Sequence, residues 1–137
     1  MRYMSFMATT DQIRNRTKTV TRRLGWKSLK PGDLIQAIEK GQGLKKGEKV
    51  NRLAVLRVES VRREKLADIV GNVGECAKEG FPKLSGMSFV LMFCDLNRPC
   101  KPDWDVTRIE FSYVDSPRTS LGDAMEPAKA TAASEAP

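Results

Sequence analysis

Histidine is missing from this chain of 137 residues, and its absence excludes several kinds of site. No Ser-His-Asp triad, Cys-His dyad or histidine-containing zinc site can be built without it. Any acid–base chemistry must therefore use lysine, glutamate, aspartate, tyrosine or cysteine side chains.

Cysteine is scarce as well, because the chain contains only Cys76, Cys94 and Cys100. Their number is odd and no two of them have the CxxC spacing. We therefore expect free thiols in a reducing cytoplasm rather than a disulfide framework. Three cysteines can ligate a metal in principle, but we expect neither a metal nor a cofactor.

Long apolar runs are also lacking. The longest, FVLMFC (residues 89–94), is far too short to cross a bilayer. The first ten residues, MRYMSFMATT, have neither the apolar core nor the cleavage site of a secretory signal. We expect a soluble, cytoplasmic protein with no membrane partner.

The charge of the chain is unevenly distributed. Residues 1–65 contain 17 Lys/Arg and 6 Asp/Glu, a net +11, whereas residues 66–137 contain 7 and 11, a net −4; together they give the total of +7. A basic half of this kind attracts polyanions such as RNA, and a simply solvated lysine-rich surface is the alternative interpretation.

The hydrophobic pattern predicts about five or six strands with helices between them, an α+β fold. Strands are expected over residues 2–7, 17–23, 33–39, 52–61 and 106–114, and helices over residues 11–15, 64–70, 75–79 and 85–96. Thr9 or Thr10 is expected to cap the first helix, and Ser85 the last. The last helix has a buried strand as its alternative, and Pro31-Gly32 predicts a type II turn.

Residues 40–49, KGQGLKKGEK, predict a loop or a hairpin tip. After Asp115 the chain is small, polar and dotted with proline, which is typical of a disordered tail. We therefore expect one domain over residues 1–115 and a disordered tail over residues 116–137.

The stretch RNRTKTVTRRLGW (residues 14–26) combines five cations with three threonines. Together with GW, LKPGD (residues 29–33), LAVLRV (53–58), VRREKL (61–66), EGFP (79–82), FVLMF (89–93) and VTRIEFSYVD (106–115), it resembles the ASCH domain, a family related to the PUA domain. The match covers about residues 4–115, and its most specific part is the Lys-Thr-x-Thr-Arg pattern followed by EGFP. The resemblance implies a small PUA-like β-barrel and an RNA-related role.

One branch of small bacterial ASCH proteins consists of amidohydrolases that act on N4-acetylcytidine. Carried over by motif, the resemblance implies Lys18, Thr21 and Glu79 as catalytic residues. Thr21 would be the nucleophile or would position a water; Lys18 would be the base or would stabilise the oxyanion; Glu79 would protonate the leaving nitrogen or hold the base of the substrate. Ordinary alternatives are a strand-forming threonine, a surface lysine and a solvated glutamate.

A shared site imposes a condition on the backbone. Residues 18 and 21 of a regular strand point to opposite faces, so the chain must bend or bulge between them. A straight strand would instead place Lys18, Val20 and Arg22 on one face.

The sequence also suggests residues that would bind RNA or a nucleotide. Arg22 and Arg23 would hold a phosphate or a carboxylate partner, and Trp26 would stack on a base or close a core. Glu64 is expected to form an internal ion pair, and Arg108 and Glu110 a cross-strand surface pair. The complete set of candidate binding residues is Arg16, Thr19, Arg22, Arg23, Trp26 and Arg57.

Three classes of function follow. The first is an RNA- or nucleoside-binding module with a basic pocket around KTVTRR, whose partner is RNA or a modified nucleoside. The second is an enzyme, either an amidohydrolase on N4-acetylcytidine or a ribonuclease. The third is a protein-interaction role, which only the tail and the extra loops favour.

Overall fold

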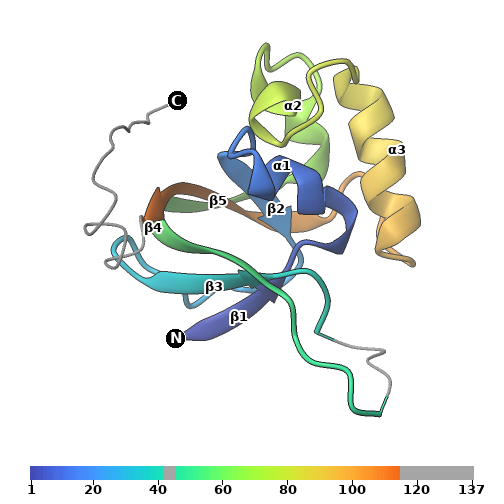
Figure 1. Ribbon diagram of the computed structural model, residues 1–137. Helices are drawn as coiled ribbons and strands as arrows, with labels where there is room; N and C mark the ends of the chain where they lie inside the picture. The colour runs from blue at the N-terminus through green and yellow to red at the C-terminus, as the bar shows by residue number, and fades with distance from the viewer. Residues whose placement is uncertain (42–45, 115–137) are drawn as a thin grey trace. The chain divides into compact units, whose positions relative to one another are not determined.

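A computed structural model describes residues 1–41 and 46–114 of the chain. The expected tail and part of the 40–49 loop lie outside these residues. Figure 1 shows the elements in chain order. They are β1 (Arg2–Ser5), the 3-10 helix η1 (Met7–Thr9), α1 (Thr10–Arg14), β2 (Val20–Arg23), β3 (Leu34–Ile38), β4 (Arg52–Lys65), the 3-10 helix η2 (Leu66–Ile69), α2 (Glu75–Lys78), α3 (Gly86–Leu96) and β5 (Asp105–Val114).

The five strands are hydrogen-bonded in the order β1-β3-β4-β5-β2. The described residues divide into two units: residues 1–17, 34–41, 46–56 and 113–114 form the first, and residues 18–33 and 57–112 form the second. In the first unit β1 pairs in parallel with β3, with Arg2 opposite Ile35. In the second unit β2 pairs antiparallel with β5, with Arg22 opposite Arg108. Strand β4 runs from the first unit into the second.

The short helix α1 in the first unit does not begin as expected. Thr9 is its N-cap residue but makes no capping hydrogen bond through its side chain. Thr10 is the first residue of the helix itself, and its hydroxyl donates back to the carbonyl of Phe6 at 3.0 Å. The prediction of a threonine cap was wrong, because neither hydroxyl accepts a hydrogen bond from the N–H groups of the first turn. The buried apolar side chains of this unit are Met4, Phe6, Ile13, Ile35, Ala37, Ile38 and Leu56.

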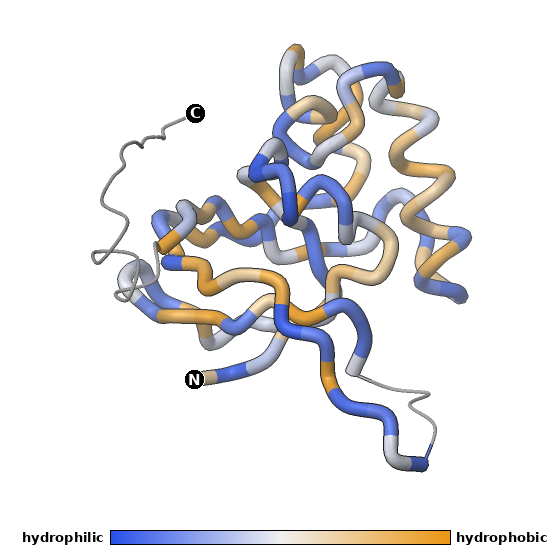
Figure 2. The backbone as a smooth tube through the Cα atoms, viewed as in Figure 1, coloured by the Kyte–Doolittle hydropathy of each residue, from blue (hydrophilic) through white to orange (hydrophobic). Residues whose placement is uncertain are grey.

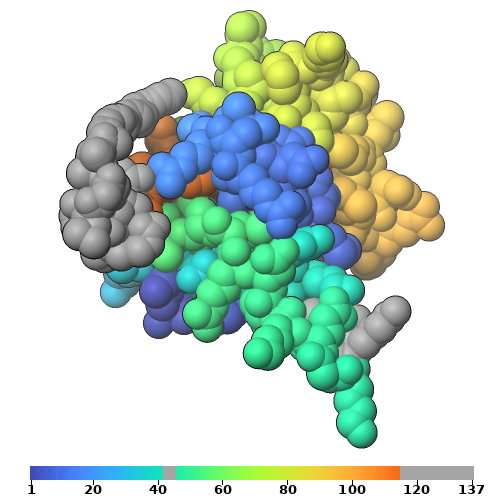
Figure 3. Space-filling model, viewed as in Figure 1, coloured from blue at the N-terminus to red at the C-terminus, as the bar shows by residue number. Residues whose placement is uncertain are grey.

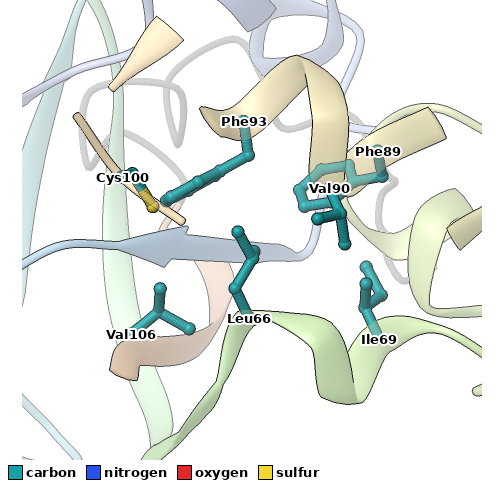
Figure 4. Packing of buried hydrophobic residues seen from close by; sticks show 7 residues of the cluster. All are labelled: Leu66, Ile69, Phe89, Val90, Phe93, Cys100 and Val106. Carbon is teal, nitrogen blue, oxygen red and sulfur yellow. The ribbon is translucent and has the colours of Figure 1, made fainter. Parts of the chain in front are cut away.

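Helix α3 organises the core of the second unit. The hydroxyl of Ser85 accepts a hydrogen bond from the backbone N–H of Ser88 at 3.1 Å, so the predicted cap and helix are confirmed and the alternative strand was wrong. Figure 4 shows the core cluster that α3 forms with η2 and β5. Its buried members are Leu66, Ile69, Phe89, Val90, Phe93, Cys100 and Val106.

The opposite side of α3 is exposed. Met87, Leu91 and Leu96 retain more than half of their accessible surface, and the α3 segment forms part of the face seen in Figure 3 (yellow to orange). Leu96 is the last residue of the helix.

Strand β4 is longer than expected, and the helix predicted over residues 64–70 shrinks to η2. The backbone N–H groups of Leu66 and Ala67 donate to the carbonyls of Trp104 and Pro102, both at 2.9 Å, rather than to carbonyls within a helix.

The turn predicted at Pro31-Gly32 is confirmed. Gly32 has φ of 95°, and the N–H of Asp33 donates to the carbonyl of Lys30.

The predicted α+β class is confirmed with five strands. Figure 2 shows the hydropathy along the chain, in which the first half of β4 is largely apolar. Among residues 1–41 and 46–114, no helix combines the length and the apolar character needed to span a membrane.

Candidate functional site

Lys18 lies just before β2 and is buried, with 3% of its surface exposed. The backbone of its neighbour Thr19 fixes this position, because its N–H donates to the carbonyl of Lys78 at 2.8 Å and its carbonyl accepts from Phe111 at 3.0 Å. The Lys18 ammonium donates to the backbone carbonyl of Glu79 at 2.7 Å and to its Oε1 at 2.8 Å. In the structure Lys18 is therefore not a surface cation.

Glu79 follows the short helix α2 and is 2% exposed. One carboxylate oxygen accepts from Lys18, and the other accepts from Nη1 of Arg22 at 2.9 Å. Glu79 is thus held between two cations, which allows a carboxylate to stay ionised away from water.

Arg22 occupies the centre of this arrangement, with its side chain fully buried. Besides Glu79, its guanidinium donates to Glu75 at 2.6 Å and to Glu64 at 3.1 Å. The carboxylate alternative considered for Arg22 is therefore the one in the structure. The internal ion pair expected for Glu64 is confirmed.

Arg108 corrects another expectation. It was predicted to pair with Glu110 on the surface, but it is buried and binds Glu75 with two hydrogen bonds of 2.9 and 3.1 Å. Glu110 instead accepts from the hydroxyl of Ser60. Because Arg108 lies opposite Arg22 on the neighbouring strand, one carboxylate can serve both guanidinium groups.

These contacts shift the pKa values of the buried groups. Burial lowers the pKa of Lys18 below its ordinary value, and the adjacent carboxylate of Glu79 offsets this effect only in part. Burial alone would raise the pKa of Glu75, but the hydrogen bonds and charges of Arg108 and Arg22 outweigh it and hold this pKa at about 2. Glu75 is therefore a permanent anion at neutral pH.

Thr21 is buried on β2, and its hydroxyl accepts a hydrogen bond from Nε of Arg23 at 3.1 Å. Thr21 and Arg23 alternate with Arg22 along the strand, so their side chains start from the opposite face. Burial lowers the pKa of Arg23 to about 10, and the charge of Glu79 acts against this. The charge of Arg23 in turn lowers the pKa of Lys18. Arg23 thus links Thr21 electrostatically to the Lys18–Glu79 pair.

We call this group of buried or half-buried ionised side chains the charge cluster. All of its members belong to the second unit. They are Lys18, Arg22, Arg23, Glu64, Glu75, Glu79 and Arg108.

The other predicted binding residues have different environments. Arg16 belongs to the first unit, has φ of 63°, and places its guanidinium 5.3 Å from the ring centroid of Tyr113. Trp26 is half-buried with φ of 54°, and Arg57 is exposed on β4. Thr19 is half-buried beside Lys18. Their binding roles stay predictions.

Glu64, Glu75 and Arg108 are the members that the sequence did not reveal as site residues, although an internal ion pair was expected for Glu64. For Arg108 the signal was its place in the run VTRI (residues 106–109). The structure buries all four of these residues. An arginine in a strand that is covered on both faces needs a carboxylate partner. Among the described residues, no group of three or more potential ligands is arranged to hold a metal ion.

Comparison with known proteins shows which solved structures are similar to this fold. A scan of protein-family models and a search of curated proteins find no match. Among solved structures, the chain is similar to the hypothetical protein PH0355, with 19% identity, a TM-score of 0.57, and coverage of 83% of this chain and 100% of that one. It is also similar to protein EF3133 from Enterococcus faecalis V583, with 14% identity, a TM-score of 0.56, and coverage of 83% and 79%.

An ASCH domain structure from Lactobacillus crispatus JV V101 is matched as well, with 14% identity, a TM-score of 0.48, and coverage of 82% and 78%. The first two matches establish that this small α+β fold occurs in solved proteins. The small α+β fold expected from the sequence is confirmed by the first two matches, and the ASCH assignment stays a prediction.

Proposed function

We propose that the chain binds RNA or a nucleoside at the charge cluster. The observation that supports this proposal most is the balance of charge inside the cluster. Four cationic side chains face three carboxylates, an excess of one positive charge in a largely buried environment. A buried cation attracts an electron-rich oxygen more strongly than a solvated one does, because the local dielectric constant is low.

The hydrogen-bonding groups of the cluster suit a nucleobase. The Lys18 ammonium and the Glu79 carboxylate lie side by side, and such groups can pair with a base carbonyl and an exocyclic amine respectively. Each carboxylate oxygen has two acceptor positions, so Glu79 can also receive an exocyclic amine. Because Arg23 and Thr19 are half-buried, a ligand would approach from their side.

Exposed cations of the same unit would hold the phosphates. Strand β4 carries Arg57, Arg62, Arg63 and Lys65 on its exposed positions. Arg62 and Arg63 already donate to Glu64 and Thr107, which holds their side chains in defined positions. Contacts of this kind orient RNA without reading its sequence.

The test is the affinity of the protein for a fluorescent single-stranded RNA at increasing salt. With about three phosphates bound, we expect affinity to fall roughly 20-fold between 50 and 200 mM salt, because bound counterions are released. The double variant Arg57→Ser/Lys65→Ser should flatten this slope. Affinity that does not depend on salt would rule out phosphate recognition.

Hydrolysis of N4-acetylcytidine is the second candidate function, and the buried Lys18–Glu79 pair favours it. In this scheme the hydroxyl of Thr21 attacks the acetyl carbonyl, and Lys18, as an ammonium, stabilises the oxyanion. The Glu79 carboxylate takes the proton that the Thr21 hydroxyl loses and delivers it to the departing cytosine nitrogen as the C–N bond breaks. Water then releases acetate from Thr21, so the products are cytidine and acetate.

Chromatography of N4-acetylcytidine after incubation with the protein tests this scheme. We expect cytidine to form with the native chain and with Thr21→Ser, which keeps a hydroxyl, and to be lost by at least about 100-fold in Thr21→Val, which has the same shape without one. Equal turnover by both variants would exclude Thr21 as nucleophile. If the native chain gives no cytidine, only the binding proposal stands.

A further inference from the structure

We propose that Cys94 and Cys100 form a dithiol modification site that is oxidised reversibly to an intramolecular disulfide. The site is independent of the proposed nucleoside site and uses none of its residues. It rests on the placement of two sulfur atoms at the end of α3.

The turn after α3 brings the two thiols together. Cys94 lies in the last turn of the helix, and its Sγ is 3.8 Å from Sγ of Cys100, within a thiol–thiol hydrogen bond. Asn97 sets the turn: its N–H donates to the carbonyl of Cys94 at 3.3 Å, and its carbonyl accepts from the N–H of Cys100 at 2.9 Å. Its side-chain amide also donates to the carbonyl of Phe93 at 2.9 Å.

The surroundings of Cys94 and Cys100 favour the short movement that would bring their sulfur atoms to the distance of a disulfide bond. A disulfide requires the sulfur atoms to approach to about 2.05 Å, which is within reach of side-chain rotation from 3.8 Å. Figure 4 shows Cys100 among Phe93, Leu66 and Val106 in the core cluster, so its position is fixed. Cys94 is only half-buried, which gives a soluble oxidant access to one sulfur of the pair.

The order of the reaction follows from these environments. Burial and the adjacent Cys94 raise the pKa of Cys100 to about 11, so Cys100 is protonated at neutral pH. The reaction therefore begins at the more accessible Cys94. Its thiolate attacks glutathione disulfide, which forms a mixed disulfide and releases one glutathione thiolate.

Cys100 completes the exchange. It loses its proton, attacks the Cys94 sulfur of the mixed disulfide and releases the second glutathione. Overall, two protein thiols are oxidised to one disulfide, and one glutathione disulfide is reduced to two glutathione thiols, which take up both protons. The bond would tie the end of α3 to the segment 97–104, whose Pro102 and Trp104 carbonyls accept from the start of η2.

Mass spectrometry of the full chain tests the proposal. Trypsin does not cleave at Arg98 or Lys101, because proline follows each, so both cysteines lie in the peptide 84–108, whereas Cys76 lies in the peptide 66–78. After incubation with glutathione disulfide and alkylation, we expect the peptide 84–108 to lose two hydrogen atoms and both alkylation sites. The peptide 66–78 should be alkylated, and dithiothreitol should restore both thiols of the longer peptide.

Matched variants make the test decisive. Cys76→Ser should leave the result unchanged, and Cys100→Ser should stop the reaction at a stable glutathione adduct on Cys94. Three outcomes would overturn the proposal: an adduct on Cys94 in the native chain that Cys100 does not displace, a bond between two chains, or oxidation of Cys76 before the pair.

Discussion

Replacing Arg22 with methionine is expected to lower the free energy of unfolding by about 5 kcal/mol, at the upper end of the range for breaking a buried ion pair. The reason is that the Arg22 guanidinium donates to three carboxylates at once, those of Glu64, Glu75 and Glu79. Methionine fills a similar volume but leaves this negative charge without its central partner. Urea denaturation followed by circular dichroism measures the loss.

Arg57→Met is the matched control for this prediction. Arg57 is exposed on β4, so the same change should alter the free energy of unfolding by less than about 0.5 kcal/mol. Equal losses in the two variants would mean that the buried network contributes no more than a surface cation.

The effect of Arg22→Met should also depend on pH. In the native chain the folded-state pKa of Glu75, about 2, lies below its unfolded value. This difference stabilises the fold above the unfolded pKa and is lost as pH falls towards 2. Arg22 is one of the cations that lower the pKa of Glu75. The Arg22→Met variant therefore has less of this pH-dependent stabilisation to lose. The difference in free energy of unfolding between the native chain and Arg22→Met should therefore become smaller as the pH is lowered.

Glu79→Gln is expected to lower the free energy of unfolding by about 3 kcal/mol, because it removes the negative charge that Lys18 and Arg22 share. The amide keeps the shape of the carboxylate, so the loss reports on charge rather than on packing. Lys18 retains the backbone carbonyl of residue 79 as an acceptor, and Arg22 retains Glu75 and Glu64, which makes the expected loss smaller than for Arg22→Met.

Glu48→Gln is the control, because it makes the same chemical change in an exposed ion pair. Glu48 pairs with Lys40 at 3.5 Å on the surface, with more than a third of both side chains exposed. Such a pair contributes at most about 1 kcal/mol. If Glu79→Gln costs no more than Glu48→Gln, the buried carboxylate does not hold the cluster together.

The strands and the last helix were predictable because their patterns are local. Val106–Val114 alternates at the period of a strand, and Ser85 precedes an apolar stripe at the period of a helix. The end of β4 was missed, because Arg62, Arg63, Glu64 and Lys65 carry no apolar pattern. Their strand conformation depends on pairing with β5, which sequence periodicity does not register.

The site was predictable in part, and for a different reason. The contact between Lys18 and Glu79 joins residues 61 positions apart, so no local period could predict it, and it came from the ASCH resemblance. Arg108 was misjudged because strand alternation assigns a face but does not say whether that face is covered. Both faces of β5 are buried at residues 106–109, and the arginine there requires Glu75.

The affinity of Lys18→Met for a cytidine-containing single-stranded RNA tests the central claim most directly, with Lys27→Met as control. Lys27 is exposed in the same unit, so both variants lose one positive charge and differ only in whether it lies in the charge cluster. The fold should persist in Lys18→Met, because Glu79 keeps Arg22 as its partner. Binding at the cluster predicts a loss of affinity of about tenfold or more for Lys18→Met, from a lost charged hydrogen bond, and a smaller, salt-sensitive loss for Lys27→Met. Equal affinities of the two folded variants would contradict a nucleoside site at Lys18.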